Sequence, residues 1–381
     1  MLECAWGLLN SLRSLIPLLP RIIQVEVSTK CQLRCCFCPR TLLKDRWRSE
    51  DISWDNFARL LPYVGKAELV HLQGWGEPLL HPDIWKMARA IKEKGGRVSM
   101  TTNGVLLDDA AVRQICEIGF AFIAVSVAGA RAATHDSLRT GSSFGQICIN
   151  ISRLSGAKSH PDIHLVMQMM KPNIDELPGL VDLAAELRAD RVIAPNLDYT
   201  PVAEMEDLKV FGRIRDPHLE DIIEEAKMRG KKRGIEVQIY PLEPDVNSPV
   251  CSDDPLHNIV VNVRGEVSPC VYLSMPIEGE IPRVFWSEDS WVSRFAYGKV
   301  EDGLNHILES AQAQQFRRAF SRRVEYARLN AAKTMALLTL PGIRNVRNIL
   351  QGTMGQASIS APPAMPQAPM QCRKCYKLQG I

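Results

Sequence analysis

The sequence has little excess of either charge sign and no long uninterrupted apolar run. Its 381 residues include 46 Lys and Arg against 43 Asp and Glu, for a formal net charge of +3. That balance does not favour nucleic acid as a partner. The apolar segment Leu2–Ile23 is interrupted by charged residues and prolines, which makes it too polar for a membrane span, and it lacks a small-residue cleavage site. We therefore expect an amphipathic helix over residues 1–21, without stable membrane contact.

The eleven cysteines are not arranged as in a secreted disulfide scaffold. Such scaffolds are short and dense in cysteine, whereas this chain is long and places several of its cysteines in close groups. Close groups of cysteines in a long chain are typical of metal sites. The pattern therefore favours a reducing, cytoplasmic location.

Three of these cysteines, Cys31, Cys35 and Cys38, follow the apolar run Ile22–Val27 with the spacing C-x3-C-x2-C. Iron–sulfur clusters are held by cysteine thiolates, usually four of them. Three thiolates in one loop can hold three irons of a [4Fe-4S] cluster and leave the fourth iron open to a substrate or cosubstrate. Cys36 lies within this stretch but does not fit the spacing. A zinc site or chance clustering is the alternative interpretation.

Strand-like and helix-like segments alternate from residue 22 to residue 240. Short apolar segments rich in Val and Ile are typical of buried parallel strands, and repeated strand–helix units predict a parallel sheet with right-handed crossovers. We predict an α/β fold whose core, residues 22–240, is a partial (β/α)6 TIM-like barrel with ligands at the carboxyl ends of the strands. The candidate strands are Gln24–Val27, Glu68–Leu72, Arg97–Thr101, Phe122–Val127, Asp162–Met169, Asp190–Ala194 and Glu236–Tyr240. The candidate helices are Trp54–Leu61, Ile84–Lys94, Asp108–Ile118, Phe144–Ser155, Ile174–Leu187 and Leu219–Arg233.

The alternation ends after residue 240. Residues 241–320, which include a glycine-turn hairpin at Ile259–Val271, and residues 371–381 are expected to form a small cysteine-rich α+β extension. Residues 321–350 belong to a basic helical insertion, which is either a surface for an acidic partner or a solvated helix face. Residues 351–370 are rich in Ala, Pro, Ser, Gly and Gln, a composition typical of a flexible linker.

A second motif, Gly-Trp-Gly-Glu-Pro at Gly74–Pro78, directly follows the candidate strand Glu68–Leu72. Glycines let the backbone approach a ligand closely, and a glutamate can accept a hydrogen bond from an amine. Alone, the motif would be an ordinary glycine turn. Together with the cysteine spacing, it resembles the radical S-adenosylmethionine (radical SAM) superfamily of enzymes.

The resemblance implies contacts to S-adenosylmethionine (SAM) at the open end of the barrel. The Gly-Trp-Gly-Glu-Pro loop binds the methionine amino group, and the aromatic residue of the cysteine loop packs near the adenine. A serine that ends the fourth strand and an arginine beyond it hold the SAM carboxylate and ribose, since an arginine fork suits a carboxylate. One polar residue lies on the fifth strand and another follows the sixth. Each either faces SAM or substrate, or only forms hydrogen bonds with the backbone at the end of its strand. The implied residues are Phe37, Gly74, Gly76, Glu77, Pro78, Asn103, Ser126, Arg139, Gln168 and Asn196.

Four further cysteines, Cys251, Cys270, Cys372 and Cys375, form a second expected metal site. Four thiolates without an open position suit a closed site, and the arrangement resembles the SPASM or twitch extension of radical SAM enzymes. The full SPASM cysteine pattern is absent, so the resemblance implies one auxiliary iron–sulfur cluster at most. A structural zinc is the alternative, and the long separation between Cys270 and Cys372 weighs against a meeting of all four.

The resemblance implies that SAM is cleaved reductively to a 5′-deoxyadenosyl radical, which abstracts hydrogen from a peptide, protein or cofactor-precursor substrate. It names no catalytic acid or base, because the radical itself takes the hydrogen, and it implies a ferredoxin or flavodoxin as electron donor. Phrases such as Leu72–Pro82 and Asn196–Tyr199 more narrowly resemble maturases that modify the cofactor of tungsten-containing aldehyde ferredoxin oxidoreductases. A non-catalytic iron–sulfur electron carrier and a zinc-stapled binding module are the alternatives.

Overall fold

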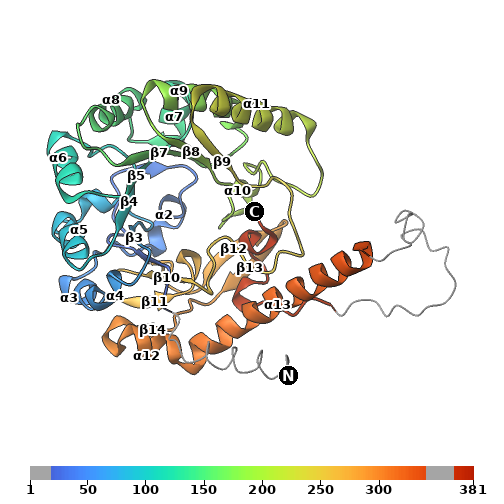
Figure 1. Ribbon diagram of the computed structural model, residues 1–381. Coiled ribbons are helices and arrows are strands. Elements are labelled where there is room, and N and C mark those ends of the chain that lie inside the picture. Colours follow the sequence, from blue (N-terminus) through green and yellow to red (C-terminus); the bar gives the residue numbers. More distant parts are fainter. Residues whose placement is uncertain (1–18, 340–363) are drawn as a thin grey trace, which may run out of the picture.

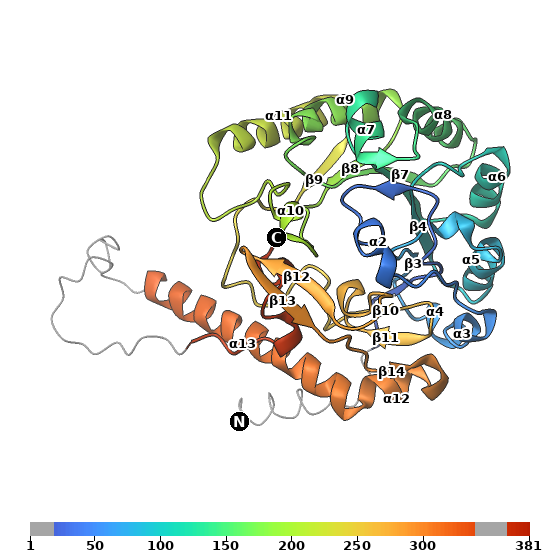
Figure 2. The same cartoon turned by 180° about the vertical axis from the view of Figure 1, so that it is seen from behind.

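The computed structural model describes residues 19–339 and 364–381, and within them a curved sheet forms most of a ring with helices on its outside (Figures 1 and 2). The expected N-terminal helix over residues 1–21 falls almost wholly outside the described residues. So does most of the expected linker over residues 351–370, together with the end of the basic stretch at residues 321–350.

The sheet contains ten strands in the order β14-β11-β10-β1-β3-β4-β5-β7-β8-β9. From β1 to β9 each strand pairs in parallel with its neighbour. The predicted parallel α/β barrel is therefore confirmed, with strand boundaries that differ from the predicted ones by at most two residues. The strands of this part are β1 (Ile22–Val25), β3 (Leu69–Leu72), β4 (Val98–Thr102), β5 (Phe122–Val127), β7 (Asp162–Met167), β8 (Arg191–Ala194) and β9 (Glu236–Ile239).

The helices that cover the outside of the sheet begin and end at local signals. Ser53 caps the first of them by accepting a hydrogen bond from the Asn56 backbone N–H at 3.2 Å, as its residue type predicts. The predicted helix Trp54–Leu61 is divided into two short helices, because Pro62 has no N–H to continue the hydrogen bonding. The helices are α3 (Trp54–Ala58), α4 (Leu61–Val64), α5 (Ile84–Glu93), α6 (Asp109–Ile118), α7 (Ala132–Leu138), α8 (Phe144–Ser155), α9 (Leu177–Glu186) and α11 (Pro217–Arg233).

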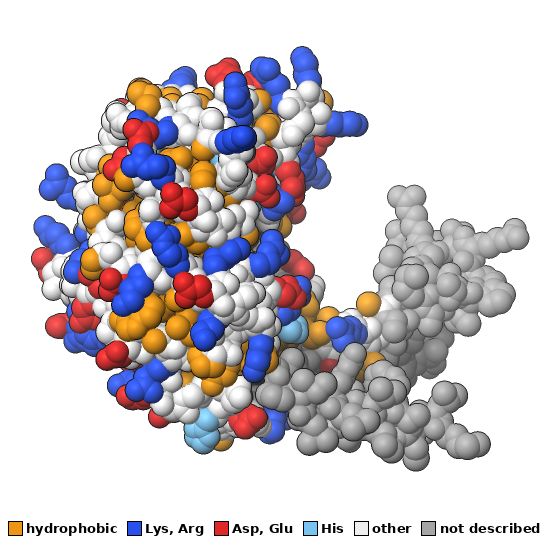
Figure 3. Space-filling view, turned by 60° about the vertical axis from the view of Figure 1, so that its left-hand side comes forward, with side chains coloured by type: hydrophobic (Ala, Val, Ile, Leu, Met, Phe, Trp, Pro, Cys, Tyr) orange, Lys and Arg blue, Asp and Glu red, His pale blue; other side chains and the backbone are white. Residues whose placement is uncertain are grey.

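Alternate residues of a core strand face two different environments. In β3, Val70 and Leu72 are fully buried, whereas His71, between them, is part-buried and lines the interior of the barrel. The outer face of the helices shows basic and acidic side chains interspersed with apolar ones (Figure 3). The functional polar residues therefore lie inside the ring, at the ends of the strands.

The C-terminal hairpin is part of the barrel sheet rather than a separate layer. β10 (Asn258–Val261) pairs in parallel with β1 and antiparallel with β11 (Glu266–Ser268), which in turn pairs with β14 (Gly298–Lys299). The hairpin of the expected α+β extension therefore continues the sheet of the barrel. The physical reason is the edge of β1: its unpaired backbone groups would be open to solvent, and β10 covers them.

A second hairpin and two helices complete the C-terminal part. The hairpin consists of β12 (Ile281–Phe285) and β13 (Glu288–Val292), and the helices are α12 (Leu304–Glu309) and α13 (Ala311–Thr339). The basic helix thus begins at residue 311, before the predicted insertion. The side chain of Arg317 donates to the Leu256 carbonyl, so this arginine holds the fold together. None of the described helices is both long and apolar enough to cross a membrane.

Candidate functional site

The cysteine loop lies at the carboxyl end of β1, where the barrel is expected to bind ligands. Cys35 belongs to the short strand β2 (Arg34–Cys35), which pairs antiparallel with β6 (Arg139–Thr140), so that Cys35 lies opposite Arg139. Cys36, by contrast, is exposed. The structure therefore separates Cys36 from its neighbours, as the spacing predicted.

Burial raises the pKa of the three predicted ligand thiols, that of Cys38 to about 11. In the metal-free chain these thiols stay protonated at neutral pH. A thiolate bound to a metal has exchanged its proton for a cation. The buried position of the three sulfurs therefore suits a bound cationic cluster core better than free thiolates.

The two glycines of the Gly-Trp-Gly-Glu-Pro loop are required by the chain itself. A Cβ at Gly76 would lie 2.4 Å from the Ser28 carbonyl oxygen and 2.5 Å from that of Lys30, and one at Gly74 would lie 2.3 Å from the Glu26 side chain. The close approach at these glycines is to Glu26 and to the backbone that leads into the cysteine loop, so they help to place that loop. The predicted contact of Gly74 and Gly76 with SAM stays a prediction.

Glu77 is buried, and its carboxylate is used mainly inside the protein. It accepts hydrogen bonds from the Thr102 hydroxyl at 2.7 Å, the Asn103 backbone N–H at 2.7 Å and the Leu79 backbone N–H at 3.1 Å. Burial raises its pKa, and these donors partly offset that effect. The three donors give this carboxylate a structural role, and its predicted contact with an amine stays a prediction. Pro78, which follows it, is buried at the start of a short 3-10 turn.

Asn103 connects the loop after β4 with the cysteine loop. Its side-chain N–H group donates to Gln32 Oε1 at 3.2 Å and approaches Cys31 Sγ at 3.6 Å. Gln32 was not among the predicted site residues, because no local pattern distinguishes it. Glu77, Asn103 and Gln32 form a chain of contacts from the end of β3 to the first cysteine.

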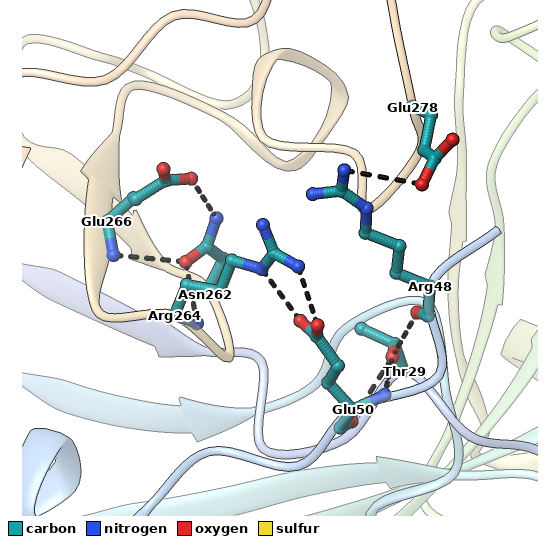
Figure 4. A network of polar contacts seen from close by, with 7 residues as sticks. All are labelled: Thr29, Arg48, Glu50, Asn262, Arg264, Glu266 and Glu278. Carbon is teal, nitrogen blue, oxygen red and sulfur yellow. Dashed lines mark hydrogen bonds and ion pairs between the residues drawn. The ribbon is translucent and has the colours of Figure 1, made fainter. Parts of the chain in front are cut away.

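The segment that returns from the cysteine loop is tied to the C-terminal hairpin (Figure 4). Thr29 Oγ1 accepts the Glu50 backbone N–H at 2.8 Å, and both carboxylate oxygens of Glu50 accept from Arg264 at 2.7 and 2.5 Å. Arg48 forms a longer ion pair with Glu278 at 3.4 Å. The start of the cysteine loop is therefore fixed by residues from both halves of the chain.

A cavity of about 590 Å³ occupies the interior of the barrel. Its volume is within the range of about 300–1,000 Å³ that is usual for small-molecule sites. The structure brings five of the predicted SAM contacts to its wall. They are Phe37, Ser126, Arg139, Gln168 and Asn196. The predicted glycines, Glu77, Pro78, Asn103 and the cysteines do not line this cavity.

Four of the cavity-lining residues carry buried polar atoms that have no partner in the protein: Arg139 Nε, Asn196 Oδ1, His164 Nδ1 and Asp253 Oδ2. The first two belong to predicted SAM contacts, in residues that are 7 % and 1 % exposed. Buried polar groups are normally hydrogen-bonded, so a donor and an acceptor are available here to a ligand. Gln168 is partly occupied, since its amide donates to the Asn196 carbonyl at 3.2 Å. The residues present fit a zwitterionic ligand such as SAM.

The opposite wall of the cavity carries a charged group that the sequence did not reveal. Lys377 Nζ lies 2.6 Å from Asp253 Oδ1 and 3.7 Å from Asp198 Oδ2, and Asp198 accepts from the Tyr272 hydroxyl at 2.5 Å. All four residues line the cavity. They come from four separate segments, and only the position of Lys377 just after Cys375 could have indicated a role.

The four C-terminal cysteines gather in one place despite their separation in the chain. Burial and the neighbouring Cys270, Cys375 and Cys251 together raise the pKa of the Cys372 thiol well above its usual value. Cys251 likewise interacts with Cys270 and Cys375. The electrostatic effects therefore connect all four cysteines despite their separation in the chain.

Arg323 explains how the two ends of this cysteine group meet. Its guanidinium donates to the carbonyls of Ser248 at 2.8 Å and Pro249 at 3.0 Å, just before Cys251, and to that of Pro366 at 2.8 Å. It thus joins the segment that precedes Cys251 to the one that leads to Cys372. This use of Arg323 favours a structural interpretation of at least part of the basic stretch.

The described residues contain no group of three or more His, Cys, Asp or Glu side chains that converges on a single metal ion.

Comparison with known families agrees with this geometry. Residues 25–184 match the model of the radical SAM superfamily, and residues 251–329 match that of SPASM, an iron–sulfur cluster-binding domain. The chain carries a radical SAM domain followed by a SPASM domain. The radical SAM domain binds a [4Fe-4S] cluster and SAM, and the SPASM domain binds auxiliary iron–sulfur clusters. The SPASM match ends before Cys372 and Cys375. In the structure these two cysteines interact with Cys251 and Cys270.

Several named proteins are similar in sequence to this chain. The chain is 24% identical over 309 residues to the tungsten-containing aldehyde ferredoxin oxidoreductase cofactor-modifying protein of Pyrococcus furiosus, covering 78% of this chain and 83% of that protein. It is 32% identical over 174 residues to the AdoMet-dependent heme synthase of Methanosarcina barkeri, and 27% identical over 187 residues to the PqqA peptide cyclase of Rhodopseudomonas palustris. The last two matches span 48% of each relative and 45% and 48% of this chain.

Solved structures confirm the fold. Streptococcus suis SuiB bound to S-adenosylmethionine aligns with a TM-score of 0.59 at 15% identity, covering 79% of this chain and 68% of SuiB. Native anSMEcpe with bound AdoMet aligns with a TM-score of 0.58 at 16% identity, covering 78% of this chain and 83% of that one. At these identities the likeness concerns the fold, and the role of each residue rests on the contacts described above.

Proposed function

We propose that this protein is a maturase-type radical SAM enzyme in which Cys31, Cys35 and Cys38 hold a [4Fe-4S] cluster. When bound, the cluster and SAM supply a 5′-deoxyadenosyl radical that abstracts hydrogen from the substrate. The observation that carries the proposal is the cavity, where five residues implied by the family resemblance meet beside the cysteine loop and leave Arg139 Nε and Asn196 Oδ1 unpartnered.

The chain's own residues bind and orient SAM in this proposal. Arg139 supplies the charge for the SAM carboxylate, since arginine binds carboxylates strongly when desolvated. Ser126 on β5 and Asn196 after β8 offer hydrogen bonds, and Phe37 offers an aromatic face beside the adenine. Glu77 acts through Asn103, which it holds against the cysteine loop, and is therefore a positioning residue.

An aromatic group closes the side of the site that faces the C-terminal domain. The Trp75 ring lies 5.8 Å from Tyr272 and 6.0 Å from Tyr199, and the two tyrosines stack at 5.1 Å. Such rings exclude water from the space they border. A radical site needs this exclusion, because water and small solutes would otherwise compete for the reactive species.

The proposed substrate is a peptide, a protein or a cofactor precursor. The support is the relative from Pyrococcus furiosus, a cofactor-modifying protein that matches along most of both chains, and the PqqA peptide cyclases, which match over about half. SuiB bound to its precursor peptide SuiA shares the fold. We propose an oxidoreductase, because the auxiliary cysteines supply a second site for an iron–sulfur cluster. The proposed electron donor is a ferredoxin or flavodoxin, and the proposed location is a reducing cytoplasm.

The test is the formation of 5′-deoxyadenosine by the anaerobically reconstituted protein with dithionite and SAM. We expect product from the wild type, and an increased KM for SAM in Arg139→Gln, because that variant loses the charge that faces the carboxylate. Arg113→Gln, on the exposed surface of α6, is the matched control and should behave as the wild type. Iron-loaded wild type that forms no 5′-deoxyadenosine would instead favour a non-catalytic electron carrier.

A further inference from the structure

Arg283 is a buried arginine beside the four C-terminal cysteines. It lies on β12 and is 5 % exposed. Burial lowers the pKa of its guanidinium, but the neighbouring Cys375, Cys270, Tyr199 and Cys372 outweigh that effect and raise it. Among the described residues, no carboxylate forms an ion pair with Arg283. A buried guanidinium without a counter-charge is costly, so the nearby sulfurs are its natural partners.

The guanidinium of Arg283 also holds the backbone between the last two cysteines. Its Nη1 donates to the Gln371 carbonyl at 3.0 Å and to the Lys374 carbonyl at 3.4 Å, which flank Cys372 and precede Cys375. Its Nε, by contrast, is buried and has no partner in the protein. Nη1 thus positions the turn that carries Cys372 and Cys375, while the Nε–H donor stays available to another acceptor.

The strand that carries Arg283 is fixed firmly to the mouth of the barrel. The Val284 backbone N–H donates to the Thr200 carbonyl at 2.7 Å, and the Tyr199 hydroxyl donates to the Pro282 carbonyl at 2.7 Å. Thr200 and Tyr199 belong to the loop after β8. The position of the guanidinium is therefore set by its two neighbours on β12, and does not depend on the cysteines alone.

We propose that Arg283 is a positioning residue that raises the reduction potential of the auxiliary cluster held by Cys251, Cys270, Cys372 and Cys375. This rests on the proposed presence of a cluster at those cysteines. The cluster with its four thiolates is anionic and gains one further negative charge when it takes up an electron. A fixed positive charge in a low-dielectric site stabilises the reduced form more than the oxidised form. A hydrogen bond to the cluster from Nε acts in the same direction.

Arg323 provides a matched control within the same domain. It is also buried, at 6 % exposure, and it also interacts with Cys372. Its Nε, Nη1 and Nη2 each donate to a backbone carbonyl, so, unlike Arg283, it has no unpartnered Nε. Replacement of Arg323 therefore removes a buried arginine of similar kind without removing an unpartnered Nε donor.

The experiment measures the midpoint potential of the auxiliary cluster by redox titration followed by electron paramagnetic resonance. The full chain is used with Cys31, Cys35 and Cys38 replaced by Ala, so that only the auxiliary cluster titrates. We expect Arg283→Gln to shift the potential to more negative values and Arg283→Lys to give an intermediate shift, because lysine keeps the charge but not the Nε donor. Arg323→Gln should shift the potential less than Arg283→Gln in whatever cluster it retains, because Arg323 interacts with Cys372 alone among the four cysteines and has no unpartnered Nε.

An unchanged potential in a cluster-loaded Arg283→Gln protein overturns the inference, as does an equal shift in Arg323→Gln. If neither Arg283 variant loads a cluster while Arg323→Gln does, Arg283 serves assembly only and the tuning role is overturned. A parent protein that binds zinc or no iron at these cysteines also overturns it. These outcomes are independent of SAM cleavage, whose absence from the wild-type protein would instead refute the proposed function.

Discussion

The Glu77 carboxylate accepts the backbone N–H of Asn103 at 2.7 Å, which ties the loop after β3 to the loop after β4. Asn103 in turn contacts Gln32 and Cys31. The two motifs that the sequence offers as SAM contacts are thus also the scaffold of the cysteine loop. A change in either motif is expected to act on cluster binding before it acts on SAM binding.

The exposure of Cys36 predicts a sharp difference between adjacent cysteines. Cys35→Ala removes a buried ligand, so we expect a loss of about four irons per chain and loss of 5′-deoxyadenosine formation. Cys36→Ala should retain the iron content and the rate of the wild type, because this thiol is exposed. Iron and sulfide analysis beside the cleavage assay measures both. Loss of activity in Cys36→Ala with Cys35→Ala still active would reverse the ligand assignment.

The contact of Gly76 with the backbone before Cys31 predicts a steric effect. In Gly76→Ala the new methyl group would meet the Ser28 and Lys30 carbonyl oxygens at 2.4 and 2.5 Å. We expect a destabilisation of about 1–3 kcal/mol, as for overpacked sites, together with weaker cluster loading. The measurements are the urea midpoint and the iron content.

Gly145 is the control for that substitution, because a Cβ there would meet nothing within 4 Å. Gly145→Ala lies in α8, where alanine is favoured over glycine by up to about 1 kcal/mol. It should therefore leave stability unchanged or slightly raised, with normal iron content. Equal losses in the two variants would show that the close approach at Gly76 is not the cause.

The buried carboxyl group of Glu26 predicts a pH dependence of stability. Burial raises its pKa to about 8, above the ordinary carboxyl value. In the unfolded chain the group ionises at lower pH than in the folded chain, so stability is lost as pH rises toward 8. Glu26→Gln cannot ionise and keeps an acceptor for the Trp75 N–H. We therefore compare the free energy of unfolding of Glu26→Gln with that of the wild type. We expect the difference, in favour of the variant, to increase by roughly 2 kcal/mol from pH 6 to pH 8, at about 1.4 kcal/mol per pH unit.

Glu68→Gln is the comparison for this pH effect. Glu68 is exposed and paired with Arg21, whose hydrogen bond lowers the pKa of the carboxyl group. Its contribution is therefore complete above the ordinary carboxyl pKa and does not change between pH 6 and pH 8. Urea unfolding of the iron-free proteins gives both differences. A pH-independent difference for Glu26→Gln would mean that Glu26 is ionised in the folded state.

The sequence predicted the features that depend on local pattern. The parallel strands, the Ser53 cap and the isolation of Cys36 from the cysteine spacing are all visible over a few neighbouring residues. The family resemblance further placed Phe37, Ser126 and Arg139 at one cavity, which the structure shows on its wall. These successes rest on periodicity and on motifs that lie just after strands.

The features that escaped prediction depend on residues far apart in the chain. Nothing near Glu77 indicated that its carboxylate would be used by the loop after β4, and nothing near β10 indicated that it would cover the edge of β1. The meeting of Cys251 with Cys372 needs Arg323, and the cysteine turn needs Arg283. Such long-range hydrogen bonds to backbone carbonyls leave no local signature, since a buried arginine looks the same in the sequence as an exposed one.

Cys31, Cys35 and Cys38 would hold a [4Fe-4S] cluster that binds SAM, with Arg139 and Asn196 of the cavity wall orienting the SAM molecule. The most direct test is the electron paramagnetic resonance spectrum of the dithionite-reduced protein, with Cys251, Cys270, Cys372 and Cys375 replaced by Ala, recorded with and without SAM. The account predicts a reduced-cluster signal that changes when SAM is added. A reduced cluster whose signal is the same with and without saturating SAM would contradict it.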